Sequence, residues 1–285
     1  MNILISGLNN YVGRRCISLM ADEDFRVFAI TRNRKLFQER MSEPVRADVF
    51  ELDLLKGGEE SDIHISNLET SFYFTQVPTL DDLVNLRVEL LCLRNFIHLI
   101  KRMNCNRLIY VARLMDKSCL QPVLDLLKEF QVDYTVVLKN IVVGKDSLLY
   151  NIYQRMAANS VLFYAKHYGE SLFQPIGIYD FVRWLKAMVP VPAFHYNVLE
   201  LGGEEVISMI DLYRLYRRLK LKLKARRMIY LPNWLLGLLY KREMDNNTEA
   251  GELLRIMQAG GVVDNSWKAY LPFTFSSLND ILVAD

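Results

Sequence analysis

Short apolar runs alternate with amphipathic helical patterns over the first 140 residues, and this alternation constrains the fold more than any other feature. Strands separated by helices of this length pair in parallel through right-handed crossovers. The pattern therefore predicts a doubly wound parallel sheet of the α/β class. The expected strands are residues 2–6, 26–30, 45–52, 72–75, 107–112 and 134–138, and the expected helices are 11–21, 33–41, 80–103 and 120–130.

The rhythm changes after about residue 138. Short extended segments (161–164, 197–201 and 221–230) then mix with helical ones (178–188, 209–219, 232–243 and 249–257). We expect residues 1–140 to form the sheet domain and residues 141–285 a smaller α+β portion, partly interleaved with the sheet. Ligands of open α/β sheets bind beyond the carboxyl ends of the strands, so we expect the second portion to cover that cleft.

The turn between the first strand and the first helix carries Gly7 and Gly13 at the outer positions of a GxxGxxG spacing. Gly7 permits a tight turn, Gly13 permits close approach of helix and strand, and the helix start offers N–H groups to a pyrophosphate. Asn10 replaces the middle glycine, and asparagine tolerates left-handed backbone geometry better than most residues. The segment predicts a dinucleotide-phosphate site; the alternative is a plain strand–helix turn.

The second expected strand runs into Thr31-Arg32-Asn33-Arg34-Lys35, where a carboxylate would select NAD by binding the adenosine ribose. Cations stand there instead, and they can pair with a ribose 2′-phosphate. The segment favours NADP(H) over NAD(H). The alternative is a solvated basic helix start.

Composition excludes several other classes. Thirty-five basic and 33 acidic residues leave a net charge of +2, so we expect no nucleic-acid partner. Cys16, Cys92, Cys105 and Cys119 form no CxxC pair and the four histidines are scattered, which predicts buried free thiols, no metal site and a reducing compartment. We find no targeting segment and no apolar run of about 20 residues, so we expect a cytoplasmic protein without membrane association.

Six segments together resemble the NmrA-like, atypical branch of the short-chain dehydrogenase/reductase superfamily. The stretch from Ser6 to Gly13 is similar to that family's TGATGYVG turn, and Thr31-Arg32-Asn33 to its phosphate-binding segment after the second strand. Leu52-Asp53-Leu54 is similar to its adenine-flanking Asp-Leu. Further matches are Asn106–Val111, Val143–Ser147, and Gln174-Pro175-Ile176 followed by Asp180.

The resemblance implies a Rossmann sheet with strand order 3-2-1-4-5-6 and a small C-terminal substrate domain. It also implies an NAD(P)-binding protein, either an NADP(H)-dependent oxidoreductase or a redox sensor that binds the nucleotide without turnover. The candidate cofactor-binding residues are Gly7, Asn9, Asn10, Tyr11, Val12, Gly13, Thr31, Arg32, Asp53 and Leu54.

The chain departs from the family where proton transfer takes place. Active short-chain dehydrogenases carry a Tyr-x-x-x-Lys pair in which the lysine lowers the tyrosine pKa, but residues 111–125 contain no tyrosine. The catalytic residues therefore stay unknown, with Lys117, Lys139 or water as candidate proton donors. Two functions stay open: a reductase with a non-standard proton relay, and a non-catalytic NADPH-sensing or scaffold protein.

Two further runs have alternative interpretations. Residues 214–227 hold eight cations and no carboxylate, which suits either an anionic partner or a helix end followed by an exposed edge strand. The apolar residues 234–240 suit either a core helix or a substrate wall. The sequence is compatible with a homodimer and does not identify a small-molecule substrate.

Overall fold

The computed structural model describes residues 1–41, 45–57, 63–158, 161–164, 169–219, 227–230, 232, 255–257 and 259–284. The chain forms two compact units. The first unit comprises Met1–Lys139, Val182–Glu200 and Ser266–Pro272, and the second comprises Asn140–Phe181, Leu201–Asn265 and Phe273–Asp285. The chain therefore returns to the first unit twice after leaving it at residue 139.

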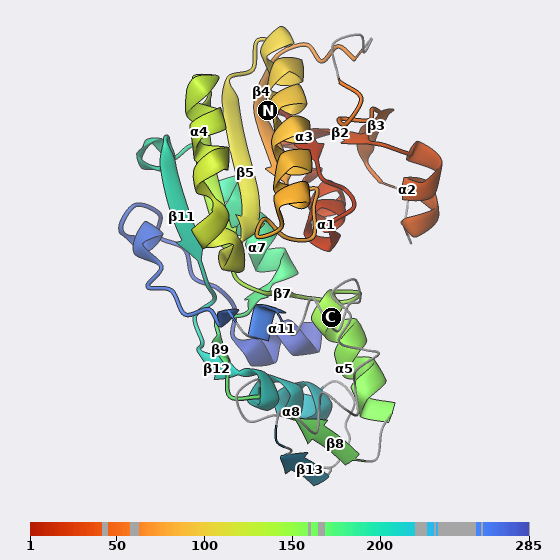
Figure 1. The fold of residues 1–285 in the computed structure, drawn as a ribbon, viewed down its shortest axis with the longest axis vertical. Helices are drawn as coiled ribbons and strands as arrows, with labels where there is room; N and C mark the ends of the chain where they lie inside the picture. Colours follow the sequence, from red (N-terminus) through yellow and green to blue (C-terminus); the bar gives the residue numbers. More distant parts are fainter. Residues whose placement is uncertain are drawn as a thin grey trace. The chain divides into compact units, whose positions relative to one another are not determined.

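A seven-stranded sheet forms the centre of the first unit, in the order β11-β6-β5-β4-β1-β2-β3 (Figure 1). The first six strands pair in parallel in the predicted order 3-2-1-4-5-6, which confirms the doubly wound fold. The seventh strand lies beside β6, where Tyr196 N–H donates to Tyr134 O. The strands are β1 (Asn2–Ser6), β2 (Arg26–Thr31), β3 (Ala47–Glu51), β4 (Leu68–Phe74), β5 (Arg107–Arg113), β6 (Asp133–Lys139) and β11 (Asn197–Leu201).

Four helices connect these strands: α1 (Tyr11–Met20), α2 (Arg34–Arg40), α3 (Leu83–Arg102) and α4 (Gln121–Glu129). Helices α3 and α4 lie on one face of the sheet (Figure 1). Successive strand side chains point to opposite faces, so alternate residues such as Leu4, Phe28, Tyr73 and Tyr110 join the buried residues of α3 and α4 in one core. Helix α1 meets the opposite face, where Gly13 approaches the ring of Phe74.

The structure corrects the predicted start of β4, which begins at Leu68 rather than at residue 72. Thr70 and Ser71 are buried although they are polar. The Ser71 hydroxyl donates to Arg107 O at 2.8 Å, so this polar group is satisfied inside the sheet. The apolar pattern therefore did not reveal the first residues of β4, because buried polar residues occupy positions where apolar ones are expected.

Aromatic side chains from the later segments complete the first unit. Trp184 of α7 (Ile178–Met188) packs against Phe194 and Trp267 with ring centroids 6.4 and 5.4 Å apart. Phe194 belongs to η2 (Pro192–Phe194) and Trp267 to η3 (Ser266–Ala269), both short 3-10 helices. These three rings are fully buried.

Among the residues that the structure describes, the second unit contains three strand pairs and the helices α5, α8 and α11. Helices α5 and α11 were not predicted, whereas α8 confirms the helix predicted at 209–219. The structure does not describe residues 233–243 of the predicted helix 232–243, which include the apolar run 234–240. It also does not describe most of the predicted helix 249–257, nor residues 220–226 of the basic run. The elements are β7 (Val142–Val143) with β10 (Ile176–Gly177), β9 (Leu172–Phe173) with β12 (Ile207–Ser208), β8 (Val161–Tyr164) with β13 (Arg227–Tyr230), α5 (Leu148–Ala158), α8 (Met209–Leu219) and α11 (Leu278–Ala284).

The cysteines agree with the predicted free thiols, with one correction. Cys16, Cys92 and Cys105 are buried and unpaired, and burial raises the pKa of the Cys92 thiol to about 12. Cys119 is free but partly exposed, because it ends the short 3-10 helix η1 (Leu114–Cys119).

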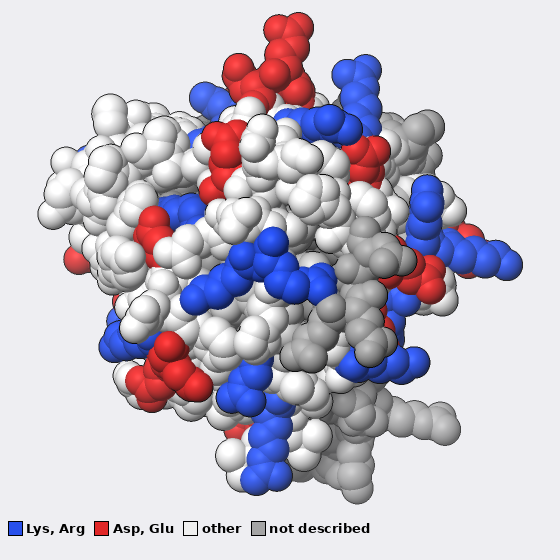
Figure 2. All heavy atoms as spheres, turned by 90° about the horizontal axis from the view of Figure 1, so that it is seen from above, with Lys and Arg blue, Asp and Glu red and all other residues white. Residues whose placement is uncertain are grey.

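The surface carries charges of both signs. Lys and Arg side chains are interspersed with Asp and Glu side chains on the face shown in Figure 2. Within the described residues, no helix has both the length and the apolar character that crossing a membrane requires.

Candidate functional site

A cavity of about 580 Å³, counted with its open mouth, lies at the carboxyl ends of β1 to β4 in the first unit. The turn after β1 contributes Ser6, Leu8 and Asn9, and Gln76 follows β4. The remaining lining residues come from the end of β2, the segment after β3 and one face of α3: Ile30, Thr31, Arg32, Leu52, Asp53, Leu54, Leu55, Val88 and Cys92. This is the edge at which open α/β sheets bind ligands.

Two glycines allow the turn beside the cavity to form. Gly7 has φ +92°, a left-handed value that favours glycine, and a Cβ there would lie 2.7 Å from the Phe74 Cβ. A Cβ at Gly13 would lie 2.5 Å from Gly7 O. Strand β4, the turn and helix α1 are therefore packed as closely as the backbone permits, as the sequence predicted for Gly7 and Gly13.

Asn10 differs from its expected conformation. Its φ of −78° and ψ of 137° are extended, so the left-handed geometry that asparagine tolerates is not used. Asn10 is instead the N-cap of α1, and its Oδ1 accepts a hydrogen bond from Val12 N–H at 2.9 Å. The side chain that replaces the middle glycine thereby occupies one of the N–H groups expected to face a phosphate.

Arg14 is a residue of this turn that the sequence analysis missed. Its Nη1 donates to Asn9 O at 2.9 Å and to Leu8 O at 3.4 Å. The guanidinium of a first-turn helix residue is thus held against the turn, where the helix dipole disfavours a cation and favours an anion. An arginine directly after a glycine-rich turn is the signal that could have identified it.

The end of β2 places Arg32 in the cavity wall with an exposed side chain. Asn33 caps α2 through its Oδ1, which accepts from Leu36 N–H at 2.9 Å. Glu51, at the end of β3 and in register with Thr31, accepts a hydrogen bond from Arg34 N–H at 3.0 Å. Residues 31–35 contain no carboxylate, and the one at this place, Glu51, comes from the neighbouring strand β3.

Asp53 and Leu54, which the resemblance predicts to flank an adenine, follow β3 and line the cavity. The Asp53 Oδ1 accepts from Leu55 N–H at 3.1 Å, which stabilises a tight turn. Leu54 is buried, and its carbonyl accepts from Asn95 Nδ2 of α3 at 2.7 Å. This wall is therefore anchored to the helix that forms the apolar side of the cavity.

The cavity residues Ser6 and Gln76 are joined by a hydrogen bond in which Gln76 Nε2 donates to Ser6 Oγ at 2.9 Å. The backbone N–H of Gln76 donates to Glu89 Oε2 of α3 at 2.9 Å. Glu89 is fully buried, and burial raises the pKa of its carboxyl group from 4.5 to about 7. Neither Gln76 nor Glu89 belongs to the predicted site.

The carboxyl end of β5 holds ion pairs where the family carries its proton-transfer residues. Asp116 is buried and binds the Arg113 guanidinium at 2.8 and 3.2 Å. Lys117, a candidate proton donor, forms an ion pair with Glu200. Lys139, the other candidate, is largely buried at the end of β6.

The structure divides the ten candidate cofactor residues into two adjacent groups. Asn9, Thr31, Arg32, Asp53 and Leu54 line the cavity. Gly7, Asn10, Tyr11, Val12 and Gly13 build the turn and the first residues of α1 beside it. Among the described residues, no group of His, Cys, Asp or Glu side chains is arranged to hold a metal ion.

No protein-family model matches the chain, and no curated protein is similar to it in sequence. Solved structures match it closely in fold. A nucleoside-diphosphate-sugar epimerase from Staphylococcus aureus is 14% identical with a TM-score of 0.68, and the match covers 99% of this chain and 100% of that one.

Two further structures extend this comparison. UDP-glucuronic acid 4-epimerase from Bacillus cereus, in complex with UDP-glucuronic acid and NAD, is 14% identical with a TM-score of 0.67, covering 99% of this chain and 96% of that one. An NADPH-dependent quinone oxidoreductase from Escherichia coli is 13% identical with a TM-score of 0.67, covering 99% and 98%. At these identities the likeness shows the fold: the chain has the Rossmann-type α/β fold that the epimerases and the quinone oxidoreductase share.

Proposed function

We propose that the cavity at the carboxyl ends of β1 to β4 binds NADP(H), and that the chain is an NADP(H)-dependent reductase with a non-standard proton relay. The observation that carries the proposal is the position of Arg32 in the wall of a cavity that also contains Asp53 and Leu54. The glycine turn supports it, because a Cβ at Gly7 or Gly13 would fill the space that lets β4, the turn and α1 meet.

The lining residues suit the parts of the nucleotide. Ile30, Leu54, Val88 and Cys92 offer an apolar wall to an adenine ring. Arg32 offers a guanidinium that can bind two oxygens of a 2′-phosphate at once. The turn from Leu8 to Asn10, with the Arg14 guanidinium against it, offers positive potential to the pyrophosphate.

The bound NADPH would supply a hydride, and the chain would supply binding, orientation and a proton. No tyrosine follows β5 to donate that proton. Lys117, Lys139 or water is therefore the proposed donor, with Lys117 first required to leave its ion pair with Glu200. The structures similar in fold include an NADPH-dependent quinone oxidoreductase, so quinones are the first substrate class to test.

Replacing Arg32 tests the proposed cofactor choice. Arg32→Ala should weaken NADPH binding by about tenfold to a hundredfold, because a charge-assisted contact is worth about 1.5–3 kcal/mol, and should leave NADH binding nearly unchanged. Arg32→Asp should favour NADH. Calorimetric titration with each nucleotide measures both effects, and Arg34→Ala is the matched control, since the hydrogen bond to Glu51 comes from its backbone.

The possible results separate the claims. Equal weakening of NADPH and NADH would mean that Arg32 holds the loop and does not contact the phosphate. Failure of both nucleotides to bind at about millimolar concentration would remove the cofactor proposal altogether.

A second candidate is a nucleotide sensor that binds NADPH without turnover. The ion pairs Arg113–Asp116 and Lys117–Glu200 favour it, because they engage the groups after β5 in structural contacts. NADPH oxidation across carbonyls, quinones and imines decides between the two. Turnover of any substrate that depends on Arg32 excludes the sensor, and NADPH binding without oxidation across the whole panel supports it.

A further inference from the structure

A buried carboxylate lies directly behind the cavity. Glu89 is on α3, one helical turn from the cavity residue Cys92, and its exposed fraction is 0%. Its Oε2 accepts from Gln76 N–H at 2.9 Å and its Oε1 accepts from Tyr110 Oη–H at 3.0 Å. Because a buried carboxylate is costly, its hydrogen-bond partners determine whether it carries a charge.

A short chain of contacts joins Glu89 to the cavity. The Glu89 carboxylate accepts a hydrogen bond from Gln76 N–H and so holds the Gln76 backbone in place. The side-chain amide of Gln76 donates to Ser6 Oγ at 2.9 Å. Gln76 and Ser6 both line the cavity. Glu89 is therefore connected to the cavity-wall residue Ser6 through two hydrogen bonds, by way of Gln76.

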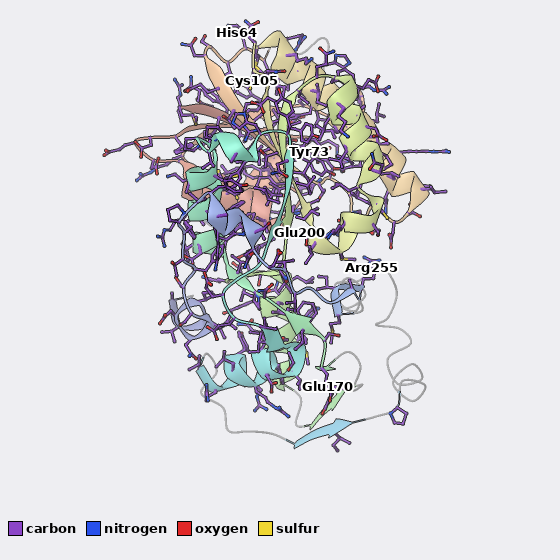
Figure 3. The ribbon with its side chains drawn as sticks, turned by 90° about the vertical axis from the view of Figure 1, so that its left-hand side faces the viewer. His64, Tyr73, Cys105, Glu170, Glu200 and Arg255 are labelled. Carbon is purple, nitrogen blue, oxygen red and sulfur yellow. The ribbon has the colours of Figure 1, made fainter. Side chains whose placement is uncertain are left out.

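Titratable groups from β4, β5, α3 and η1 surround Glu89. Strand β4 contributes Tyr73, β5 contributes Tyr110, α3 contributes Cys92 and η1 contributes Asp116, which is itself paired with Arg113. Tyr73 lies in the packed interior of the first unit (Figure 3). Its hydroxyl has no hydrogen-bond partner within the described part of the chain.

These surroundings set the proton affinity of Glu89. Burial is the largest influence and raises the pKa, and the negative charge of Asp116 raises it further. Hydrogen bonds from Gln76, Tyr110 and Val77 lower it, and the balance leaves the pKa at about 7. The group is therefore poised between its charged and neutral forms near neutral pH.

We propose that Glu89 is a positioning residue for Gln76 and takes up a proton when an anionic nucleotide enters the cavity, so that nucleotide affinity falls as pH rises through neutrality. The proposal rests on the proposed nucleotide-binding function and adds its regulation by protons. The proton comes from solvent and is added to Oε1. Oε2 continues to accept from Gln76 N–H, and Oε1–H donates to Tyr110 Oη.

Two effects explain why nucleotide binding should raise the pKa of Glu89. A phosphate in the cavity repels the Glu89 carboxylate, and the nucleotide displaces water that would stabilise its charge. Both effects favour the protonated form in the complex. By linkage, a ligand that raises the pKa of a group binds more tightly where that group is protonated.

Calorimetry of NADH binding tests the proposal, because NADH lacks the 2′-phosphate that itself titrates near pH 6. At pH 7, wild-type protein should take up protons, seen as a binding enthalpy that depends on the ionisation enthalpy of the buffer. Its NADH dissociation constant should be about threefold to tenfold larger at pH 8 than at pH 6. Glu89→Gln should lose both effects while still binding NADH.

Glu69→Gln is the matched control, since Glu69 is an exposed carboxylate on β4, and it should keep the wild-type pH dependence. A Glu89→Gln protein with unchanged proton uptake overturns the inference. Absence of NADH and NADPH binding to wild type overturns the proposed function together with the inference. Binding without any pH dependence overturns the inference alone.

A measurement on the wild-type protein alone covers the case in which Glu89→Gln does not fold. Since the folded pKa of Glu89 is raised from 4.5 to about 7, its stabilising contribution is fully present below pH 4.5 and is lost as pH rises through about 7. Carbon-13 NMR of the wild-type glutamate carboxyls should then show one group titrating near pH 7. Its midpoint should rise when NADH is added, and a midpoint that stays in place overturns the inference.

Discussion

Single residues determine the shape of the turn after β1, where we propose that a phosphate binds. Gly7 and Gly13 act through the atom they lack, since a Cβ at either position would collide with the backbone or side chain beside it. Asn10 has the opposite effect, because its added Oδ1 accepts a hydrogen bond from Val12 N–H. A pyrophosphate bound at this turn, as proposed above, would therefore compete with the Asn10 side chain for the Val12 N–H group.

Two substitutions at Asn10 separate these effects. Asn10→Gly removes the competing oxygen and the Cβ, so dinucleotide affinity should rise about threefold to tenfold, while the free energy of unfolding falls by only a few tenths of a kcal/mol. Asn10→Ala frees the N–H but keeps the Cβ and should cost about 1 kcal/mol of stability. Calorimetric titration and urea unfolding measure the two quantities.

Adenosine 2′-phosphate is the control ligand for this pair, because it has no pyrophosphate and should bind all three proteins equally. Tighter binding of that ligand to Asn10→Gly would show that the substitution reshapes the adenosine side of the cavity, contrary to this account.

At the scale of elements, the β1–α1 connection is held against β4 by close packing, not by backbone conformation alone. Gly7 and Gly57 share a left-handed backbone, with φ of +92° and +99°. A Cβ at Gly7 would meet Phe74, whereas a Cβ at Gly57 would lie more than 4 Å from every atom in the described part of the chain. The two glycines therefore form a matched pair for separating strain from packing.

Gly57→Ala should lower the free energy of unfolding by about 1 kcal/mol, the cost of placing a Cβ in a left-handed conformation. Gly7→Ala carries this cost and an overpacking cost of about 1–3 kcal/mol besides. Urea unfolding measures both variants. Equal losses of stability would mean that β4 moves away from the turn at little cost.

A second set of contacts links β5, β6 and the segment before β11. Arg107 is largely buried, and its guanidinium contacts Asp133 Oδ1 at 3.1 Å and Thr135 Oγ1 at 2.7 Å. Asp133 also binds His195 Nδ1 at 2.8 Å, and the Thr135 hydroxyl donates to Phe194 O at 2.6 Å. These contacts hold the chain in position to add β11 to the sheet.

Asp133→Ala should therefore lower the free energy of unfolding by about 2–3 kcal/mol, because it leaves the Arg107 charge buried without its partner. Asp48→Ala is the control: its ion pair with Arg26 is exposed, with side-chain exposures of 56% and 69%. Its cost should be within about 0.5 kcal/mol. A similar small cost for Asp133→Ala would show that water reaches Arg107 readily.

At the scale of the whole molecule, the first unit is discontinuous in sequence. Residues 1–139 supply six strands, while Val182–Glu200 and Ser266–Pro272 supply the Trp184, Phe194 and Trp267 rings and most of β11. A domain boundary near residue 140 therefore leaves part of the core of the first unit on the other side. Cooperative folding of that unit requires segments separated by more than a hundred residues.

A fragment of residues 1–140 tests this dependence. Without the three aromatic rings and the seventh strand, it should unfold at lower urea concentration and with a smaller m-value than the full chain, because less surface is buried. A fragment that matches the full chain in midpoint would mean that residues 1–140 are a complete folding domain.

Local patterns determined much of the fold. Each of the six predicted strands and four predicted helices of the first 140 residues has a counterpart in the structure, because apolar periodicity is a property of neighbouring residues. The cavity wall at Thr31, Arg32, Asp53 and Leu54 was predictable for a related reason: in parallel sheets such residues follow their strands and meet at one edge.

Only the tertiary structure decided which distant groups meet. Glu51 reaches Arg34 from 17 residues away, and Glu89 reaches Tyr110 from 21. Thr135 bonds Phe194 across 59 residues. Neither strand order nor periodicity specifies these pairs, because each depends on how side chains from separate elements pack in three dimensions. The position of the cavity was therefore predictable from the sequence, whereas the positions of the charged groups Glu51 and Glu89 depend on tertiary packing.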